Sequence, residues 1–119
     1  LFMFSFEQFG VYQNAEAFYL TIVSRLIKQA NIDYVIRDQL NRAALSISLN
    51  IAEGSGRHAS GEKRHFYIIA RGSANECVSI LKMLSKLHLI ETEIYKALYI
   101  QLTEISKMLS GLIKNFEKT

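Results

Sequence analysis

The sequence RAALSISLNIAEGSGR, from Arg42 to Arg57, carries the clearest structural signal in the chain. Ala43, Ile47 and Ile51 recur at the ~3.6-residue period of an α-helix, and most residues between them are small. Because small side chains let helices approach closely, we expect this helix to lie at the centre of the packing. Gly54 and Gly56 follow it, and we expect them to end the helix in the left-handed conformation that glycine adopts without penalty.

The helical period continues on both sides of this stretch. Asp33 is placed to cap the N-terminus of the same helix, and Ser60 is placed to cap the next one. Within residues 66–87, apolar and small side chains alternate steps of four and three, which is the spacing of a bundle seam. The chain contains no proline, so long helices are permitted. We therefore predict an all-α fold: an antiparallel up-down-up-down four-helix bundle in one domain, residues 1–119, with helices at roughly 6–29, 34–54, 60–88 and 92–117.

Composition restricts the setting of the protein. Half of the residues are hydrophobic, which favours extra buried surface such as a subunit interface, although a monomer with a large core is the alternative. A single cysteine, Cys77, excludes an intramolecular disulfide and favours a reducing compartment. No apolar run approaches the ~20 residues that cross a bilayer, and the opening apolar residues are too few for a signal peptide. We expect a cytoplasmic protein without a membrane partner.

The net charge of +3 is concentrated in one segment. Residues 57–86 contain six basic and two acidic side chains, whereas residues 1–56 have a net charge of −1 and residues 87–119 are neutral. Lysine and arginine on one helix face can neutralise phosphates while carrying little sequence information. An acidic protein partner and an ordinary solvated face are the alternatives. Our candidate nucleic-acid-binding residues are, first, Arg57, Lys63, Arg64 and Arg71, and second, Arg42, Lys82 and Lys86.

Catalytic and metal-binding patterns are weak. Cys77 lies on the predicted seam, where a buried structural thiol is expected. His58 and His65 are seven residues apart, whereas metal ligands on a helix are usually three or four apart. We therefore predict no catalytic residue, no metal and no cofactor. An RNA-cleaving enzyme is a remote alternative, because a predicted helix break separates Arg57 from His65.

Three polar residues, Ser46, Asn50 and Glu53, form a line on the central helix. Buried polar groups need hydrogen-bond partners. We predict that these three form a structural polar network that fixes the register of the bundle. An acid–base role for Glu53 would need a second catalytic group, and none is evident.

At this point a resemblance is visible. Residues 39–47, QLNRAALSI, and residues 50–57, NIAEGSGR, resemble the 23S rRNA intervening-sequence protein family, and residues 9–13 and 107–113 resemble its opening and its last helix. The family consists of small bacterial four-helix bundles. The resemblance implies a ring-like homo-oligomer, commonly a pentamer, with a basic surface. Similar proteins are accessory factors of reverse transcriptases in diversity-generating retroelements, and no catalytic residues carry over.

The chain departs from the family pattern at two places. Ser48-Leu49 stands where the family often has Pro-Ser, which predicts a straighter helix. Asn41 replaces one of two arginines that many members have, so that Arg42 alone remains there.

The sequence thus predicts a non-enzymatic homo-oligomer that binds nucleic acid, above all structured RNA, through backbone phosphates. The alternative from another class is a protein-interaction scaffold, such as an accessory subunit of a reverse transcriptase. The high apolar content and the small residues of the central helix favour that alternative.

Overall fold

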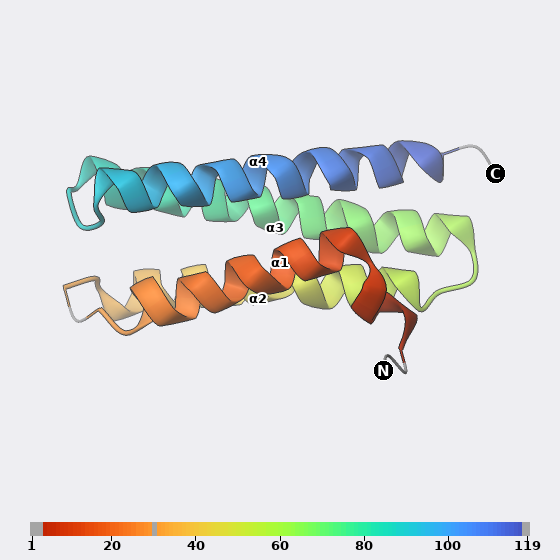
Figure 1. Cartoon of the computed structure of the whole chain (residues 1–119), viewed down its shortest axis with the longest axis horizontal. Helices are drawn as coiled ribbons and strands as arrows, with labels where there is room; N and C mark the ends of the chain where they lie inside the picture. Colours follow the sequence, from red (N-terminus) through yellow and green to blue (C-terminus); the bar gives the residue numbers. More distant parts are fainter. Residues whose placement is uncertain (1–3, 30, 118–119) are drawn as a thin grey trace.

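Four long helices lie side by side and run in alternating directions in the computed structural model, which describes residues 4–29 and 31–117. They are α1 (Gly10–Ile22), α2 (Tyr34–Ser55), α3 (Ser60–Lys86) and α4 (Thr92–Asn115). Figure 1 shows α1 and α2 as one pair and α3 and α4 as the other, with consecutive helices joined at alternate ends of the molecule. The prediction of an antiparallel up-down-up-down four-helix bundle is confirmed.

The core is built from one apolar stripe on each helix. On α3, residues of the predicted seam such as Ala70, Cys77 and Leu84 are fully buried, and Tyr67 and Leu81 beside them are buried as well. Leu87 was expected to continue this seam but is 61% exposed. Leu87 is the C-cap residue of α3, and its side chain lines a surface groove between α2 and α3 instead of packing in the core.

A residue in the left-handed conformation ends α3, and it is a histidine rather than the usual glycine. His88 has a φ of 59°, in the left-handed region that glycine usually occupies. Its N–H donates to the carbonyl of Ser85 at 3.0 Å, and the N–H of Leu89 donates to the carbonyl of Leu84 at 3.0 Å. This pair of bonds is a Schellman motif, which satisfies the last carbonyls of the helix.

Gly54 has a different role from the one that the sequence suggested. It is buried within the last turn of α2, where an added Cβ would lie 2.8 Å from Cε1 of Tyr67 and 3.1 Å from Cβ of Phe66. Gly56 caps the helix with a φ of −85°, and no glycine of the described residues has a positive φ. The expectation of left-handed glycines is therefore wrong: Gly54 lets α3 approach α2 closely.

The helix starts follow local chemistry only in part. Asp33 caps α2 as predicted, because its carboxylate accepts a hydrogen bond from the N–H of Val35 at 3.1 Å. Ser60 is the first residue of α3 and Ala59 is the N-cap, so the predicted serine cap is wrong.

The first predicted helix, at roughly 6–29, is divided in three. A 3-10 turn, η1 (Ser5–Gln8), precedes α1, and a π-helical turn, η2 (Val23–Ile27), follows it. Phe9 between η1 and α1 has an extended backbone, and glycine at position 10 lowers the helix propensity at this point. Across the described part of the chain, no helix combines the length and the apolar character that crossing a bilayer requires.

Candidate nucleic-acid interface

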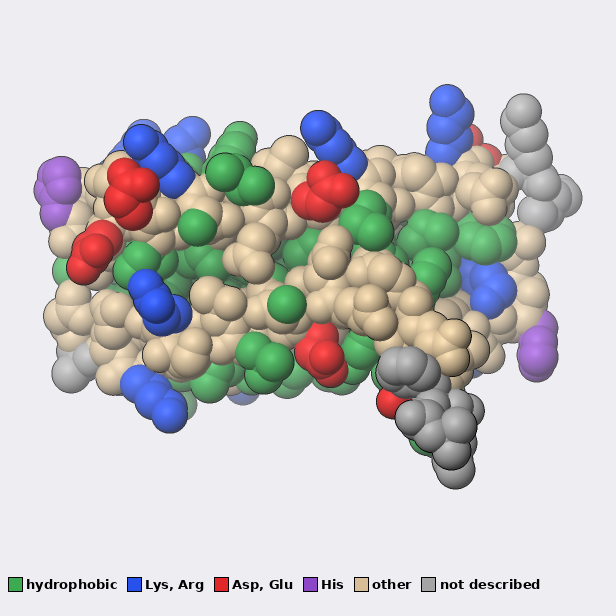
Figure 2. Space-filling view, viewed as in Figure 1, with side chains coloured by type: hydrophobic (Ala, Val, Ile, Leu, Met, Phe, Trp, Pro, Cys, Tyr) green, Lys and Arg blue, Asp and Glu red, His purple; other side chains and the backbone are tan. Residues whose placement is uncertain are grey.

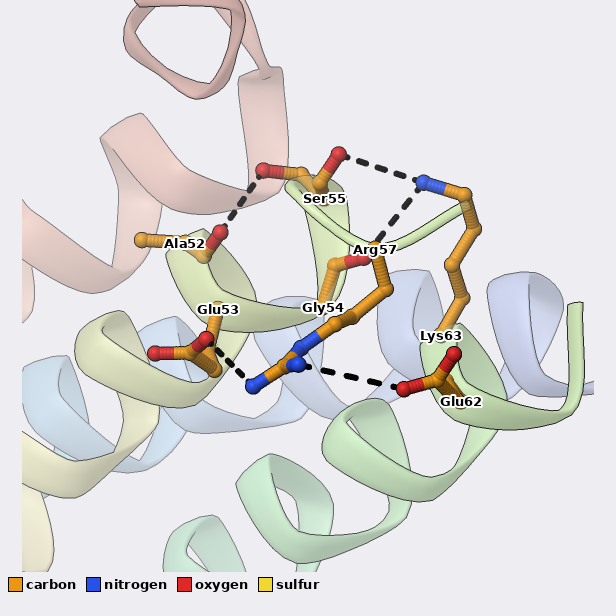
Figure 3. A network of polar contacts seen from close by, with 7 residues as sticks. All are labelled: Ala52, Glu53, Gly54, Ser55, Arg57, Glu62 and Lys63. Carbon is orange, nitrogen blue, oxygen red and sulfur yellow. Dashed lines mark hydrogen bonds and ion pairs between the residues drawn. The ribbon is translucent and has the colours of Figure 1, made fainter. Parts of the chain in front are cut away.

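Arg57 lies between α2 and α3, and its guanidinium contacts side chains of its own chain (Figure 3). Its Nη2 lies 2.8 Å from Oε2 of Glu53, and its Nη1 lies 3.8 Å from Oε2 of Glu62. The guanidinium carbon also lies 4.9 Å from the ring centroid of Phe66, a cation–π contact. Arg57 therefore pairs with two carboxylates and stacks against a ring, and it joins the end of α2 to the start of α3.

Lys63 caps the end of α2. Its Nζ donates to the carbonyl oxygen of Ser55 at 3.1 Å and to that of Gly54 at 3.4 Å, as Figure 3 shows. The last carbonyls of a helix lack backbone partners and carry the negative end of the helix dipole, so an ammonium group is stabilising there.

Arg71 connects α3 to α4, and Arg64 connects α3 to the residues that follow α4. Nη2 of Arg64 lies 3.8 Å from Oε1 of Glu117, and Nη1 of Arg71 donates to Oγ of Ser110 at 3.1 Å. Within the part of the chain that the structure describes, Arg71 forms no ion pair, and neither do Lys82 and Lys86. These three side chains therefore keep an unbalanced positive charge.

A groove of about 700 Å³ separates α3 from α4. Its floor is apolar and its sides are polar and basic, with no aspartate or glutamate among its lining residues. Arg71 lies beside it, through the contact with Ser110. The polar and basic lining residues are Asn75, Ser79 and Lys82 on α3 and Tyr99, Thr103, Ser106, Lys107 and Ser110 on α4.

The remaining candidates lie outside this groove. Arg42, on α2, is exposed, and its Nε lies 3.0 Å from Oδ2 of Asp38. Lys86 is exposed one turn beyond Lys82 on α3. Figure 2 views the bundle from the side of α1 and α4: acidic and basic side chains are interspersed there, and several Lys and Arg side chains stand along the edge that α3 and α4 form.

Sequence reasoning missed the α4 side of the groove. Lys107 belongs to a segment whose net charge is zero, so counting charge along the chain did not select it. The signal was present in the spacing, because Tyr99, Thr103, Ser106 and Ser110 recur at steps of four and three on one face of α4.

The polar line on α2 is a network of two of its three predicted members. Nδ2 of Asn50 donates to Oγ of Ser46 at 2.9 Å and to its carbonyl at 2.8 Å, and Oγ of Ser73 on α3 donates to Oγ of Ser46 at 2.9 Å. Glu53 does not belong to this network. Its side chain is 53% exposed, and Arg57, four residues further on, lies within reach and pairs with it.

Cys77 is fully buried, and burial, with a smaller contribution from the charge of Glu76, raises the pKa of its thiol to about 12. A thiol in this state is not an activated nucleophile. In the described ranges, 4–29 and 31–117, no group of three or more His, Cys, Asp or Glu side chains is arranged to hold a metal ion.

These features define a small antiparallel helical bundle whose candidate site is a cationic groove between two helices. The chain belongs to the 23S rRNA-intervening sequence protein family, whose sequence profile matches residues 7–111. The resemblance carried by residues 39–57 is thereby confirmed.

One solved structure extends the comparison. It is that of a protein with unknown function from the S23 ribosomal protein family of Bacteroides thetaiotaomicron VPI-5482. It is similar to this chain with a TM-score of 0.83 and 29% sequence identity, and the match covers 87% of this chain and 98% of that one. No curated protein shows a significant match.

Proposed function

We propose that this protein is a non-enzymatic, cytoplasmic, homo-oligomeric binder of nucleic acid, with structured RNA as its ligand and the α3–α4 groove as its binding site. The observation that carries the proposal is that Lys82 and Lys107 line one groove from two different helices, and that no acidic side chain lines it with them. Arg71, which has no carboxylate partner in the described residues, extends the positive charge along α3.

The electrostatics favour a polyanion over a single anion. The cations stand on two packed helices, so their backbone positions are fixed before a series of phosphates binds, and only side-chain freedom is lost. A groove lined by one sign of charge also concentrates the field and attracts the ligand from a distance. Each phosphate that is neutralised releases counterions, and affinity for RNA should therefore fall steeply as salt is raised.

The candidate residues differ in the contacts that they would lose on binding a phosphate. Arg57 and Lys63 already contact acidic side chains or helix carbonyls of their own chain, and a phosphate would have to displace those contacts. Arg64 has a single long ion pair at 3.8 Å. The proposed interface therefore consists of Arg64, Arg71, Lys82 and Lys107, with Arg42 and Lys86 as peripheral contacts.

Reversing the two groove lysines tests the proposal. The variant Lys82→Glu with Lys107→Glu should bind a structured RNA about tenfold more weakly or worse, and its salt dependence should be smaller by about two in log–log slope. The measurement is fluorescence anisotropy at two salt concentrations.

The matched control is Arg25→Glu with Lys28→Glu, which makes the same change in charge at two exposed positions that do not line the groove, one in η2 and one just after it. It should bind RNA nearly as well as the parent protein. Equal binding by the parent and the groove variant would refute the proposed site.

The oligomeric part of the proposal is supported by a second, apolar groove between α2 and α3. It has a volume of about 300 Å³, and Val35, Met83 and Leu87, which line it, are each more than half exposed. Exposed apolar side chains that gather in this way mark an interaction surface. We assign this surface to contacts between copies in a ring, with five copies as the expected number.

The same groove favours a second candidate function, a protein-interaction scaffold such as an accessory subunit of a reverse transcriptase. The two functions differ in what the protein captures. A pull-down with the full chain that recovers nucleic acid but no polymerase would count against the scaffold, and one that recovers a polymerase after nuclease treatment would favour it.

A further inference from the structure

We infer that the α3–α4 groove binds unpaired nucleotides, with a base stacked on the ring of Tyr99 and the adjoining phosphates held by Lys82 and Lys107. The inference rests on the proposed nucleic-acid binding and specifies the form of the ligand: a single-stranded segment, such as a loop within a structured RNA, rather than a duplex.

Tyr99 supplies the stacking surface. Its side chain lines the groove and is 47% exposed, although it belongs to the same helix as the buried Leu98 and Leu102. Tyr95, one turn earlier, packs on the core and lies beside it, with ring centroids 6.0 Å apart and an interplanar angle of 51°. Tyr99 is therefore supported on one side and accessible on the other, as a base-stacking side chain must be.

The rest of the groove matches a nucleotide in its chemistry. Val78 is partly exposed and, with the buried Ala74 and Leu102 beneath it, forms an apolar floor that phosphates would leave unused but that the edge or face of a base can contact. Hydroxyl groups of Ser79 and Ser106 lie around that floor and can donate to base edges or phosphates, whereas the hydroxyl of Thr103 donates to the carbonyl of Tyr99 at 2.8 Å and can only accept. A purely phosphate-binding surface would need neither the floor nor the exposed ring.

The spacing of the groups fits an extended strand. Arg71 and Lys82 are eleven residues apart on α3, a rise of roughly 16 Å, and Tyr99 and Lys107 are eight residues apart on α4, a rise of roughly 12 Å. A strand lying along the groove would meet cations on both walls and the aromatic ring on one. A duplex stacks its bases on one another and therefore offers no free base face to Tyr99 along its length.

The test uses the full chain and one labelled probe in two forms. Fluorescein-labelled oligouridylate is titrated alone and after annealing to oligoadenylate of equal length, with the parent, Tyr99→Ala, Tyr99→Phe and the double lysine reversal. We expect the parent to bind the single strand more tightly than the duplex. Tyr99→Ala should weaken single-strand binding about tenfold and leave duplex binding nearly unchanged, whereas Tyr99→Phe should bind like the parent.

The outcomes separate this inference from the proposed function. If the lysine reversal weakens binding but the duplex binds as tightly as the single strand, or Tyr99→Ala binds like the parent, the stacking inference is wrong and nucleic-acid binding stands. If the parent binds neither RNA, both fail together. Circular dichroism melting of each variant shows whether it is folded. Tyr99→Phe keeps the ring and its packing, so it is the control for Tyr99→Ala, which removes both.

Discussion

A single buried thiol links the packing of this bundle to its stability at high pH. In the unfolded chain the thiol of a cysteine ionises near pH ~8.5, whereas burial raises the pKa of Cys77 to about 12 in the folded protein. Between these values the unfolded chain releases a proton that the folded chain retains. Stability should therefore decrease as the pH rises above ~8.5, by at most about 1.4 kcal/mol per pH unit from this group.

Urea unfolding at about pH 8 and about pH 10, in the parent and in Cys77→Ala, measures this effect. The alanine variant should be less stable at about pH 8, because it leaves a cavity, but should lose less stability between the two pH values. Tyr67, whose pKa burial also raises, contributes equally to both proteins and so cancels. Identical losses in the two proteins would contradict the prediction.

At the same scale, the sequence alone could not show which candidate cations contact carboxylates or carbonyls of their own chain and which do not. Arg57 and Lys63 lie in the most basic segment, yet their contacts are with Glu53, Glu62 and the carbonyls that end α2. Which lysine caps a helix depends on how two helices meet, and that is a property of the tertiary structure. By contrast, the Asp33 cap depends only on its own backbone and was predictable.

At the scale of helices, the close approach of α2 and α3 depends on Gly54. Gly54→Ala places a Cβ 2.8 Å from Cε1 of Tyr67, whose side chain is 2% exposed and has little room to move. Alanine would gain about 1 kcal/mol in helix propensity, but overpacking costs about 1–3 kcal/mol. We expect a net loss of up to about 2 kcal/mol.

Gly72→Ala is the matched control, because Gly72 is also helical and an added Cβ there meets nothing within 4 Å. It should stabilise the protein by about 1 kcal/mol through propensity alone. Urea denaturation of both variants measures the change in the free energy of unfolding, which should be negative for Gly54→Ala and positive for Gly72→Ala. Stabilisation by both substitutions would mean that Tyr67 yields easily, and that Gly54 does not set the helix spacing.

The helices themselves were the most predictable part of this bundle, because apolar residues at steps of three and four select one buried face on each. The periodic pattern alone predicts that Ala70, Cys77 and Leu84 lie in the core, and all three are fully buried. It could not identify η2, the close contact at Gly54 or the α4 wall of the groove. Those features arise where two elements meet, and a pattern along one helix does not record its neighbour.

On the scale of the whole molecule, α3 separates two surfaces of opposite character. Lys82 lines the polar groove shared with α4, whereas the next residue, Met83, lines the apolar groove shared with α2. Successive helical residues point about 100° apart, so the two grooves open to different sides of α3, with Ser79 as the one residue that lines both. Copies of the chain that assemble through the apolar groove would keep their cationic grooves open to RNA.

Charged substitutions in the apolar groove should therefore dissociate the assembly into single chains without removing the RNA-binding site. Val35→Glu with Met83→Glu puts two carboxylates where an interface would bury them unpaired, at a cost of several kcal/mol. Multi-angle light scattering should give the parent the mass of an assembly of 13.6 kDa chains, with five as the expected number, and give the variant the mass of one chain. The exposed-site reversal Arg25→Glu with Lys28→Glu should remain assembled.

Single-site affinity for oligouridylate should persist in the monomer, whereas binding to a long RNA should weaken because the linked sites are lost. A parent that is monomeric, or a variant that keeps the parent's mass, would remove the apolar groove as the subunit interface.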